Sequence, residues 1–154
     1  MVRNALCAAA VMGCTVFNVS LALAQQPSGW IEDKQTGCLV WNVHPNPNET
    51  IKWSGTCPNM SRAEGQGTVQ WFIDGKPTER FTGEMRDGKY NGSGKVWVGD
   101  DLIFEGEFKD SLPHGQGMYF GEDDIYRGTW TNGCFQDGER KAALGATPEQ
   151  CGFR

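Results

Sequence analysis

Glycine recurs at fixed offsets from an aromatic residue in this chain, and the recurrence restricts the fold more than any other feature. The stretches FTGEMRDGKYNGSG (81–94) and FEGEFKDSLPHGQG (104–117) both place a Gly two residues after the aromatic and a G-x-G eleven to thirteen residues after it. Counted this way, the chain holds four units at intervals of 28, 23 and 22 residues, opened by Trp53, Phe81, Phe104 and Tyr126. A period in this range indicates a repeat protein, in which each unit buries its face against its neighbours.

The four units are complete to different degrees. The first has its G-x-G one residue late, and the fourth has none, as is expected of end units with only one neighbour. The repeat-defining residues are Trp53, Gly55, Gly65, Gly67, Phe81, Gly83, Gly92, Gly94, Phe104, Gly106, Gly115, Gly117, Tyr126 and Gly128.

Alternation with a period of two predicts β-strands within the units. Phe81, Gly83 and Met85 alternate with polar residues, and the same phase holds in the third and fourth units. Turn signals separate the strands at Asp74-Gly75, Asp87-Gly88, Gly99-Asp100, Asp110-Ser111, Gly121-Glu122 and Asn132-Gly133. We therefore expect an all-β fold, a single-layer antiparallel meander of about seven strands, with return strands at 66–73, 93–98 and 116–120.

The glycines inside these strands indicate ring packing. A Gly in mid-strand weakens a sheet unless another group packs on it. We predict that aromatic rings of the same or the next unit lie on the bare backbone at Gly83, Gly106 and Gly128.

The pattern aromatic-x-Gly-x-x-x-Asp-Gly-x-x-x-Gly-x-Gly resembles the repeat of the MORN (membrane occupation and recognition nexus) family. The resemblance covers residues 53–133 and departs at Ser111, which stands in place of a Gly, and in the fourth unit. It implies an elongated single-layer sheet of successive hairpins and a scaffolding or partner-binding role.

Four cysteines flank the repeats, namely Cys38, Cys57, Cys134 and Cys151. An even number in an exported chain favours disulfides. Three pairings are possible, and we favour Cys38 with Cys57 and Cys134 with Cys151, since each pair flanks one end of the repeat segment. Zinc is the alternative, but the chain has no C-x-x-C, and both His (His44, His114) lie far from any Cys in sequence.

Residues 1–24 are predicted to be a cleaved signal peptide, with Arg3 before an apolar run and an A-x-A site before Gln25. Polar residues interrupt that run, which argues against a membrane anchor. Processing as a lipoprotein at Cys14 is a minor alternative. We expect a periplasmic or secreted protein with an N-terminal cap at 25–52, the repeat meander at 53–133 and a C-terminal cap at 134–154.

The two caps differ in composition from the repeats. The N-terminal cap should hold an extra strand at 38–43, followed by a rigid loop through Pro45 and Pro47. The C-terminal cap has weak helix potential at 139–144.

No motif in the chain favours catalysis or a cofactor. The GSGK at 92–95 lacks the remaining residues of a phosphate loop and the helix that should follow. The acidic turn at 122–124 lacks the ligand spacing of a calcium loop. On the polar face, Glu84, Glu105 and Glu107 indicate a cross-strand charge ladder with Lys and Arg neighbours rather than an acid–base pair. We expect no enzyme, no cofactor and no metal.

Charge restricts the partners. The chain has 14 Lys and Arg against 19 Asp and Glu, so nucleic acid and anionic membranes should repel it. The first hypothesis is a non-catalytic module that binds a protein partner through its sheet, and the alternative is binding of a glycan or the cell wall through exposed aromatic residues. The likeliest contacts are Trp71, Trp97 and Tyr119, on return strands.

Overall fold

The computed structural model describes residues 29–153. The predicted signal peptide and Cys14 lie outside these residues. Within 29–153, no helix has the length and apolar character needed to cross a membrane.

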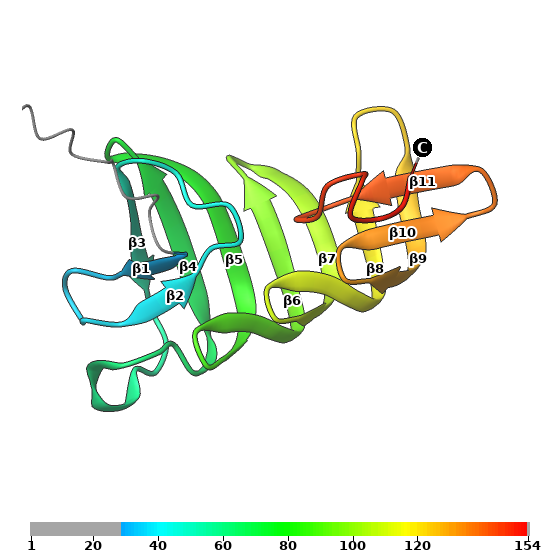
Figure 1. The fold of residues 1–154 in the computed structure, drawn as a ribbon. Helices are drawn as coiled ribbons and strands as arrows, with labels where there is room; N and C mark the ends of the chain where they lie inside the picture. Colours follow the sequence, from blue (N-terminus) through cyan, green and yellow to red (C-terminus); the bar gives the residue numbers. More distant parts are fainter. Residues whose placement is uncertain (1–28, 154) are drawn as a thin grey trace, which may run out of the picture.

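Nine strands form one antiparallel sheet in which each strand pairs with the next along the chain (Figure 1). This confirms the all-β meander. The strands are β3 (Glu49–Trp53), β4 (Gly65–Ile73), β5 (Lys76–Arg86), β6 (Lys89–Val98), β7 (Asp101–Lys109), β8 (Leu112–Phe120), β9 (Ile125–Thr131), β10 (Cys134–Asp137) and β11 (Arg140–Ala143). A 3-10 turn, η1 (Pro58–Met60), precedes β4.

The predicted count of about seven strands is wrong, because the meander continues into the C-terminal cap. Residues 140–143, which lie in the segment expected to have helix potential, form β11 and pair with β10. So short a segment is a marginal helix in water, whereas strand pairing places Ala142 opposite Phe135 in the core.

All six predicted turns connect consecutive strands. In four of them both central residues have positive φ, and the first of the two is Asp or Asn (Asp74, Asp87, Asp110, Asn132). This is the backbone that suits the twist of a tight hairpin. Ser111, where the family pattern has Gly, also adopts φ +70°. Its amide donates to the carbonyl of Tyr90 over 3.0 Å, and its hydroxyl accepts the N–H of Tyr90 over 3.2 Å. The hydroxyl thus ties this turn to the preceding repeat.

A row of glycines crosses the sheet at one level. The register pairs Gly67 with Gly83, Gly83 with Gly94, and Gly94 with Gly106, and the row continues through Gly117 to Gly128. Six strands therefore lack side chains at the same height.

Aromatic rings occupy this row. The Phe81 ring lies over Gly83 and Gly94, so that a Cβ on either glycine would come within 2.7 Å of its Cζ. The Phe104 ring covers Gly106 and Gly117 in the same way, and the Trp53 indole covers Gly55 and Gly67. The packing prediction is confirmed at these units. At Gly128 the ring is that of Phe135 from the C-terminal cap rather than that of Tyr126.

The core lies on the concave side of the curved sheet, as a continuous chain of rings. Phe81 stacks on Tyr90 with ring centroids 3.7 Å apart. Edge-to-face contacts of 5.1 to 5.4 Å then connect Phe81, Phe108, Phe104 and Trp130 in turn. Such pairs contribute about 0.5–1.5 kcal/mol beyond their buried area, and they connect successive repeats.

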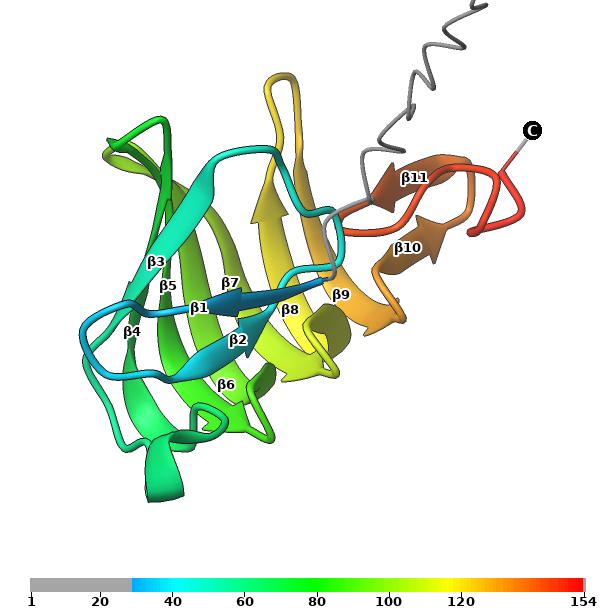
Figure 2. The same cartoon turned by 60° about the vertical axis from the view of Figure 1, so that its left-hand side comes forward.

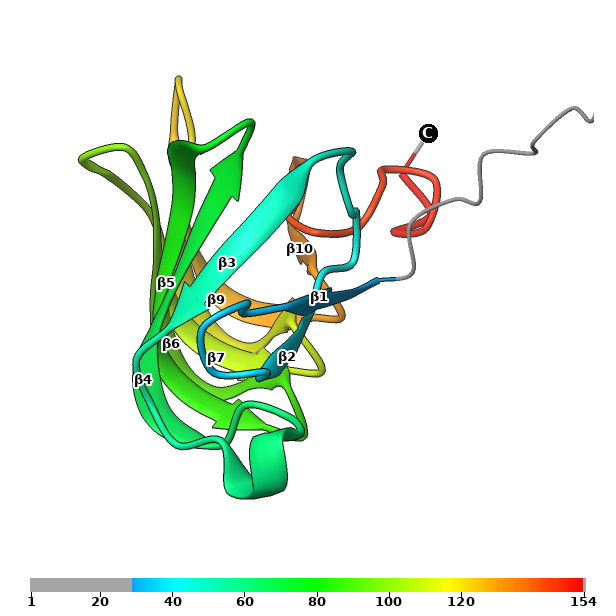
Figure 3. The ribbon, with the colours of Figure 1, turned by 90° about the vertical axis from the view of Figure 1, so that its left-hand side faces the viewer.

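The N-terminal cap covers this concave side (Figure 3). It contains β1 (Trp30–Glu32) and β2 (Leu39–Trp41), which form a separate two-stranded sheet. The strand expected at 38–43 is thus shorter than predicted. It pairs with β1 and forms a single bridge to the first repeat, between Leu39 and Arg62. The carboxylate of Asp33 accepts the backbone N–H groups of Trp53 and Gln35. Burial raises its pKa, but hydrogen bonds from Trp53, Gln35 and Thr36 together outweigh burial and lower the pKa below its usual value.

Both predicted disulfides are present. Cys38 joins Cys57, and Cys134 joins Cys151. Cys38 is fully buried in the core beside Val40 and Ala63, so the first bridge also fills space. Disulfides of this kind are typical of an oxidising, non-cytoplasmic compartment.

Candidate ligand pocket between the caps

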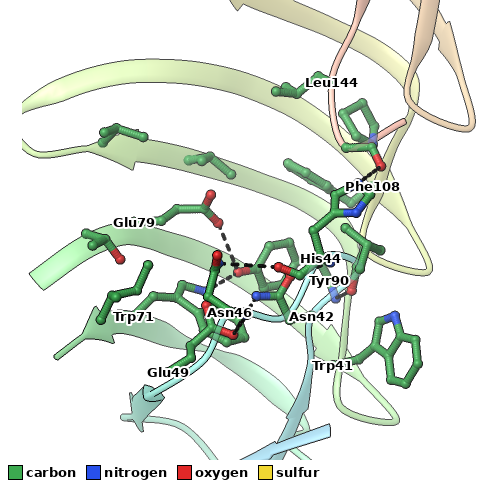
Figure 4. A pocket seen from close by; sticks show the side chains of 18 residues that line it. Trp41, Asn42, His44, Asn46, Glu49, Trp71, Glu79, Tyr90, Phe108 and Leu144 are labelled. Carbon is green, nitrogen blue, oxygen red and sulfur yellow. Dashed lines mark hydrogen bonds between the residues drawn. The ribbon is translucent and has the colours of Figure 1, made fainter. Parts of the chain in front are cut away.

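A cavity of about 430 Å³ lies between the concave face of the sheet and the two caps. Its floor comes from strands β4 to β8, one wall from the segment 41–46, and another from Leu144 and Gly145 after β11. Figure 4 shows the side chains that line it.

Local hydrogen bonds hold the N-terminal wall in place. The amide N–H of Asn42 donates to the carbonyl of Gly29, and the Asn42 side chain accepts the N–H of His44 over 2.9 Å. The segment then crosses above the sheet towards the C-terminal cap (Figure 2). There the ring Nε2 of His44 lies 3.2 Å from the carbonyl oxygen of Gly145. The two caps therefore meet over the pocket.

A buried hydrogen-bond chain forms part of the floor. The indole N–H of Trp71 donates to the hydroxyl of Tyr90 over 2.6 Å, and that hydroxyl donates to the carboxylate of Glu79 over 3.4 Å. Burial raises the pKa of Tyr90 well above its usual value, and the charge of Glu79 adds to the effect. Tyr90 therefore stays a neutral donor.

Two carboxylates line the cavity without a basic partner. Burial raises the pKa of Glu79, and the charge of Glu49 raises it further, against the opposing effect of the Tyr90 hydrogen bond. Glu49 accepts the side-chain N–H of Asn42 over 2.8 Å and the backbone N–H of Asn46 over 3.4 Å. Within residues 29–153, neither carboxylate forms an ion pair.

The three residues expected to bind a partner do not form one patch. Trp71 is buried in the pocket floor. Tyr119 lies further along the sheet, where its ring stacks on Tyr126 and meets Trp130 edge-on. Trp97 points to the opposite, outer face, between Val96 and Val98 of the pocket, and the Arg80 guanidinium lies 4.5 Å above its ring.

Comparison with known protein families identifies the repeat. The family model described as MORN repeat matches residues 81–98 and 104–124, which belong to the second and third units. The chain therefore contains MORN repeats in these two units. No curated protein matches it. MORN repeats commonly act as non-catalytic interaction or scaffolding modules.

The outer face of the MORN sheet carries the polar residues of the repeats. Lys95 and Glu105 form a cross-strand ion pair of 2.8 Å, as the charge-ladder interpretation expects. Glu84 lies 3.9 Å from Arg86 on its own strand, and Glu107 accepts the backbone N–H of Gln116 over 2.8 Å. These three carboxylates therefore form contacts within the sheet.

The remaining sequence motifs of the chain also have structural roles. The GSGK segment lies inside β6. In the acidic turn, Asp124 accepts two hydrogen bonds from the Arg140 guanidinium, which joins the β8–β9 turn to β11. Among the described residues, no cluster of three or more His, Cys, Asp or Glu side chains could hold a metal.

Glu79 and Glu49 are not among the residues predicted from the sequence, although their positions in the strands carry a signal. Counting back by two from Phe81 places Glu79 on the apolar face, and counting back from Trp53 through Ile51 places Glu49 there as well. An acidic residue at a position that the alternation assigns to the buried face interrupts the apolar core there. In this chain both interruptions line the same cavity.

Proposed function

We propose that this chain is a non-catalytic module of the cell envelope that mediates protein–protein interaction or scaffolding. The observation that supports it is the open outer face of the sheet. In the described part of the chain, the N-terminal cap with its β1–β2 hairpin and the C-terminal cap lie on or beside the concave side (Figures 1 and 3). The outer residues of the central strands, among them Thr82, Ser93 and Glu105, are exposed.

The same arrangement favours the outer face, rather than the aromatic concave face, as the surface that binds a partner. Most of the large rings on the concave side are buried against each other, including Phe81, Phe104 and Trp130. Trp97 is different, because it is half-buried on the outer face beside Arg80. Trp and Arg are enriched among residues that dominate protein interfaces. Trp97 is therefore the best-placed anchor of the three residues predicted from the sequence.

Site-specific photo-crosslinking in cells tests the proposal. A crosslinking residue at Ser93 or Gln116, both exposed on the outer face, should capture a discrete protein partner. The same residue at Asp123, in the exposed β8–β9 turn, is the matched control. Equal labelling from all three positions, or none from Ser93 and Gln116, would contradict an outer-face interface. Fractionation and mass measurement of the processed N-terminus test export independently.

Glycan binding is the second candidate, and the Tyr119–Tyr126 pair favours it. These rings are half-buried and stacked 5.7 Å apart on adjacent strands. The exposed parts of such rings can pack against sugar rings. Because Trp130 lies 6.1 Å from Tyr119, saturable tryptophan fluorescence changes on titration with peptidoglycan fragments would support this function. Unchanged emission in the presence of such fragments would argue against it.

A further inference from the structure

We propose that the cavity between the caps binds a small organic cation, an ammonium group carried on an apolar carbon body. This site is separate from the outer face, so it goes beyond the proposed function.

Charge is the first argument. Glu49 and Glu79 enter the cavity from neighbouring parts of the sheet, and the described lining residues include no Lys or Arg. The lining does include His44, whose ring Nε2 lies 3.2 Å from the carbonyl oxygen of Gly145. Two carboxylates with no counter-charge in a partly enclosed site attract a cation, and they disfavour any anionic ligand.

Hydrogen bonding gives the second argument. For Glu79, the described contacts use Oε1, which accepts the Tyr90 hydroxyl. For Glu49, they use Oε2, which accepts from Asn42 and Asn46. One oxygen of each carboxylate therefore remains available to accept from an ammonium donor. Figure 4 shows Glu49 and Glu79 on the same side of the pocket, with Trp71 and Tyr90 between them.

Apolar side chains make up much of the remaining lining and suit a carbon chain. They include Val96, Phe108, Pro113 and Leu144, and Val98, which pairs with Glu79 across the strands, lies next to the carboxylate. A volume of about 430 Å³ lies within the roughly 300–1,000 Å³ that is usual for small-molecule sites. Apolar walls with a few converging polar groups at one end fix both the identity and the direction of a ligand.

The position of Glu79 is costly to the fold. Burial raises the pKa of Glu79, which means that the cavity disfavours the charged carboxylate. A bound ammonium group would supply the missing opposite charge. Residues that lower stability while lining a cavity are typical of binding sites.

Calorimetric titration of the purified full chain with n-hexylammonium chloride tests the proposal. We expect saturable binding that weakens as salt is added. Hexan-1-ol and hexanoate, which share the chain but not the positive charge, should bind at least tenfold more weakly. No saturation by hexylammonium, or equal binding of hexan-1-ol, would overturn the proposal.

Charge-removing variants locate the binding site. Glu79→Gln and Glu49→Gln should each weaken hexylammonium binding about tenfold or more. Glu122→Gln is the matched control, because Glu122 is exposed in the β8–β9 turn, and its affinity should stay within about twofold of wild type. Circular dichroism of each variant checks folding. Unchanged affinity in a folded Glu79→Gln variant would refute the assignment of this cavity.

A second ligand distinguishes the source of the ammonium group. Nα-acetyl-lysine methylamide presents the group on a peptide backbone. Tighter binding of this compound than of hexylammonium assigns the cavity to a partner's lysine side chain, whereas tighter binding of hexylammonium assigns it to a free amine. Either order supports the cation site, and failure of both compounds to bind refutes it.

Discussion

At the scale of single residues, glycine works in this protein as a surface for rings. The row from Gly67 to Gly128 lets Phe81 and Phe104 lie flat against the backbone of two adjacent strands, and lets Trp53 lie against β4. Each ring is thereby held by its own unit and covers the return strand as well. The repeat sheet obtains much of its core in this way, and Cys38 and Val40 of the N-terminal cap complete the same core.

The first prediction concerns Gly94→Ala. Its new methyl group would overlap the Phe81 ring, with the Cζ only 2.7 Å away, and overpacking of this kind costs about 1–3 kcal/mol. The neighbouring Ser93→Ala is the control, because Ser93 is exposed on the outer face and its replacement should stay within about 0.5 kcal/mol. Urea unfolding measures both. Equal stability of the two variants would contradict ring packing on the glycine row.

The second prediction concerns Tyr90→Phe. The ring can keep its stacking on Phe81, but the buried Trp71 N–H loses its acceptor and Glu79 loses a donor. An unsatisfied buried donor costs about 1–3 kcal/mol, so urea unfolding should show a loss of that size. In Trp71→Phe the indole donor is already gone, and adding Tyr90→Phe should cost less there. Additive losses in the double variant would rule out the coupling.

The third prediction follows from the raised pKa of Glu79. Glu79 binds its proton more tightly in the folded protein than in the unfolded chain, where a Glu has a pKa of about 4.3. The free energy of unfolding therefore falls as pH rises from that value through the folded pKa. Glu79→Gln removes this penalty, so the variant should be more stable than wild type at pH 7.5. The other ionisable groups at the cavity, Glu49, His44 and Tyr90, remain in both proteins.

Urea unfolding at pH 4 and at pH 7.5 measures the difference. The stability advantage of Glu79→Gln should be larger at the higher pH. An advantage that grows towards pH 4 has the opposite sign and would contradict a raised pKa. The same substitution should weaken binding of the organic cation, so that stability and affinity change in opposite directions.

At the scale of elements, the periodicity of the sequence predicted the strands and turns of the repeats. Alternation around Phe81 and Phe104 identified the strands now seen as β5 and β7, and the pairs Asp87-Gly88 and Asp110-Ser111 identified the turns that follow them. The strand β11 was missed because its four residues carry no alternation and its partner, β10, is the source of its stability. The pocket was missed for a related reason. Its walls come from the two caps, which lie far apart in sequence and meet at His44 and Gly145.

The fourth prediction compares the two disulfides. Both close loops of similar length, with separations of 19 and 17 residues, so the loss of chain entropy is about 3 kcal/mol for each. Cys38 is fully buried, whereas Cys134 and Cys151 are only partly buried. Replacing Cys38 and Cys57 by Ala should therefore destabilise more than replacing Cys134 and Cys151, because it also leaves a gap in the core. Urea midpoints in matched double variants measure this, and the reverse order would contradict it.

At the scale of the whole molecule, the caps turn an open repeat array into a closed unit. An array that contacts only its neighbours can unfold from either end. Here the amide of Trp41 donates to the carbonyl of Gly88 at the β5–β6 turn, and His44 reaches Gly145 beyond β11. The N-terminal segment thus contacts the middle and the end of the array at once, so that its loss would affect several repeats together.

The fifth prediction is that the oxidised protein unfolds in a single transition. Four of its six tryptophans, Trp30, Trp41, Trp53 and Trp71, lie in the cap and first hairpin, so tryptophan fluorescence reports mainly on the N-terminal half. Far-UV circular dichroism reports on all the strands. Because the caps couple both ends, the two signals should give the same urea midpoint, which is the usual test of two-state behaviour. Midpoints that separate would show that the ends unfold independently, and the cap contacts would then contribute little to cooperativity.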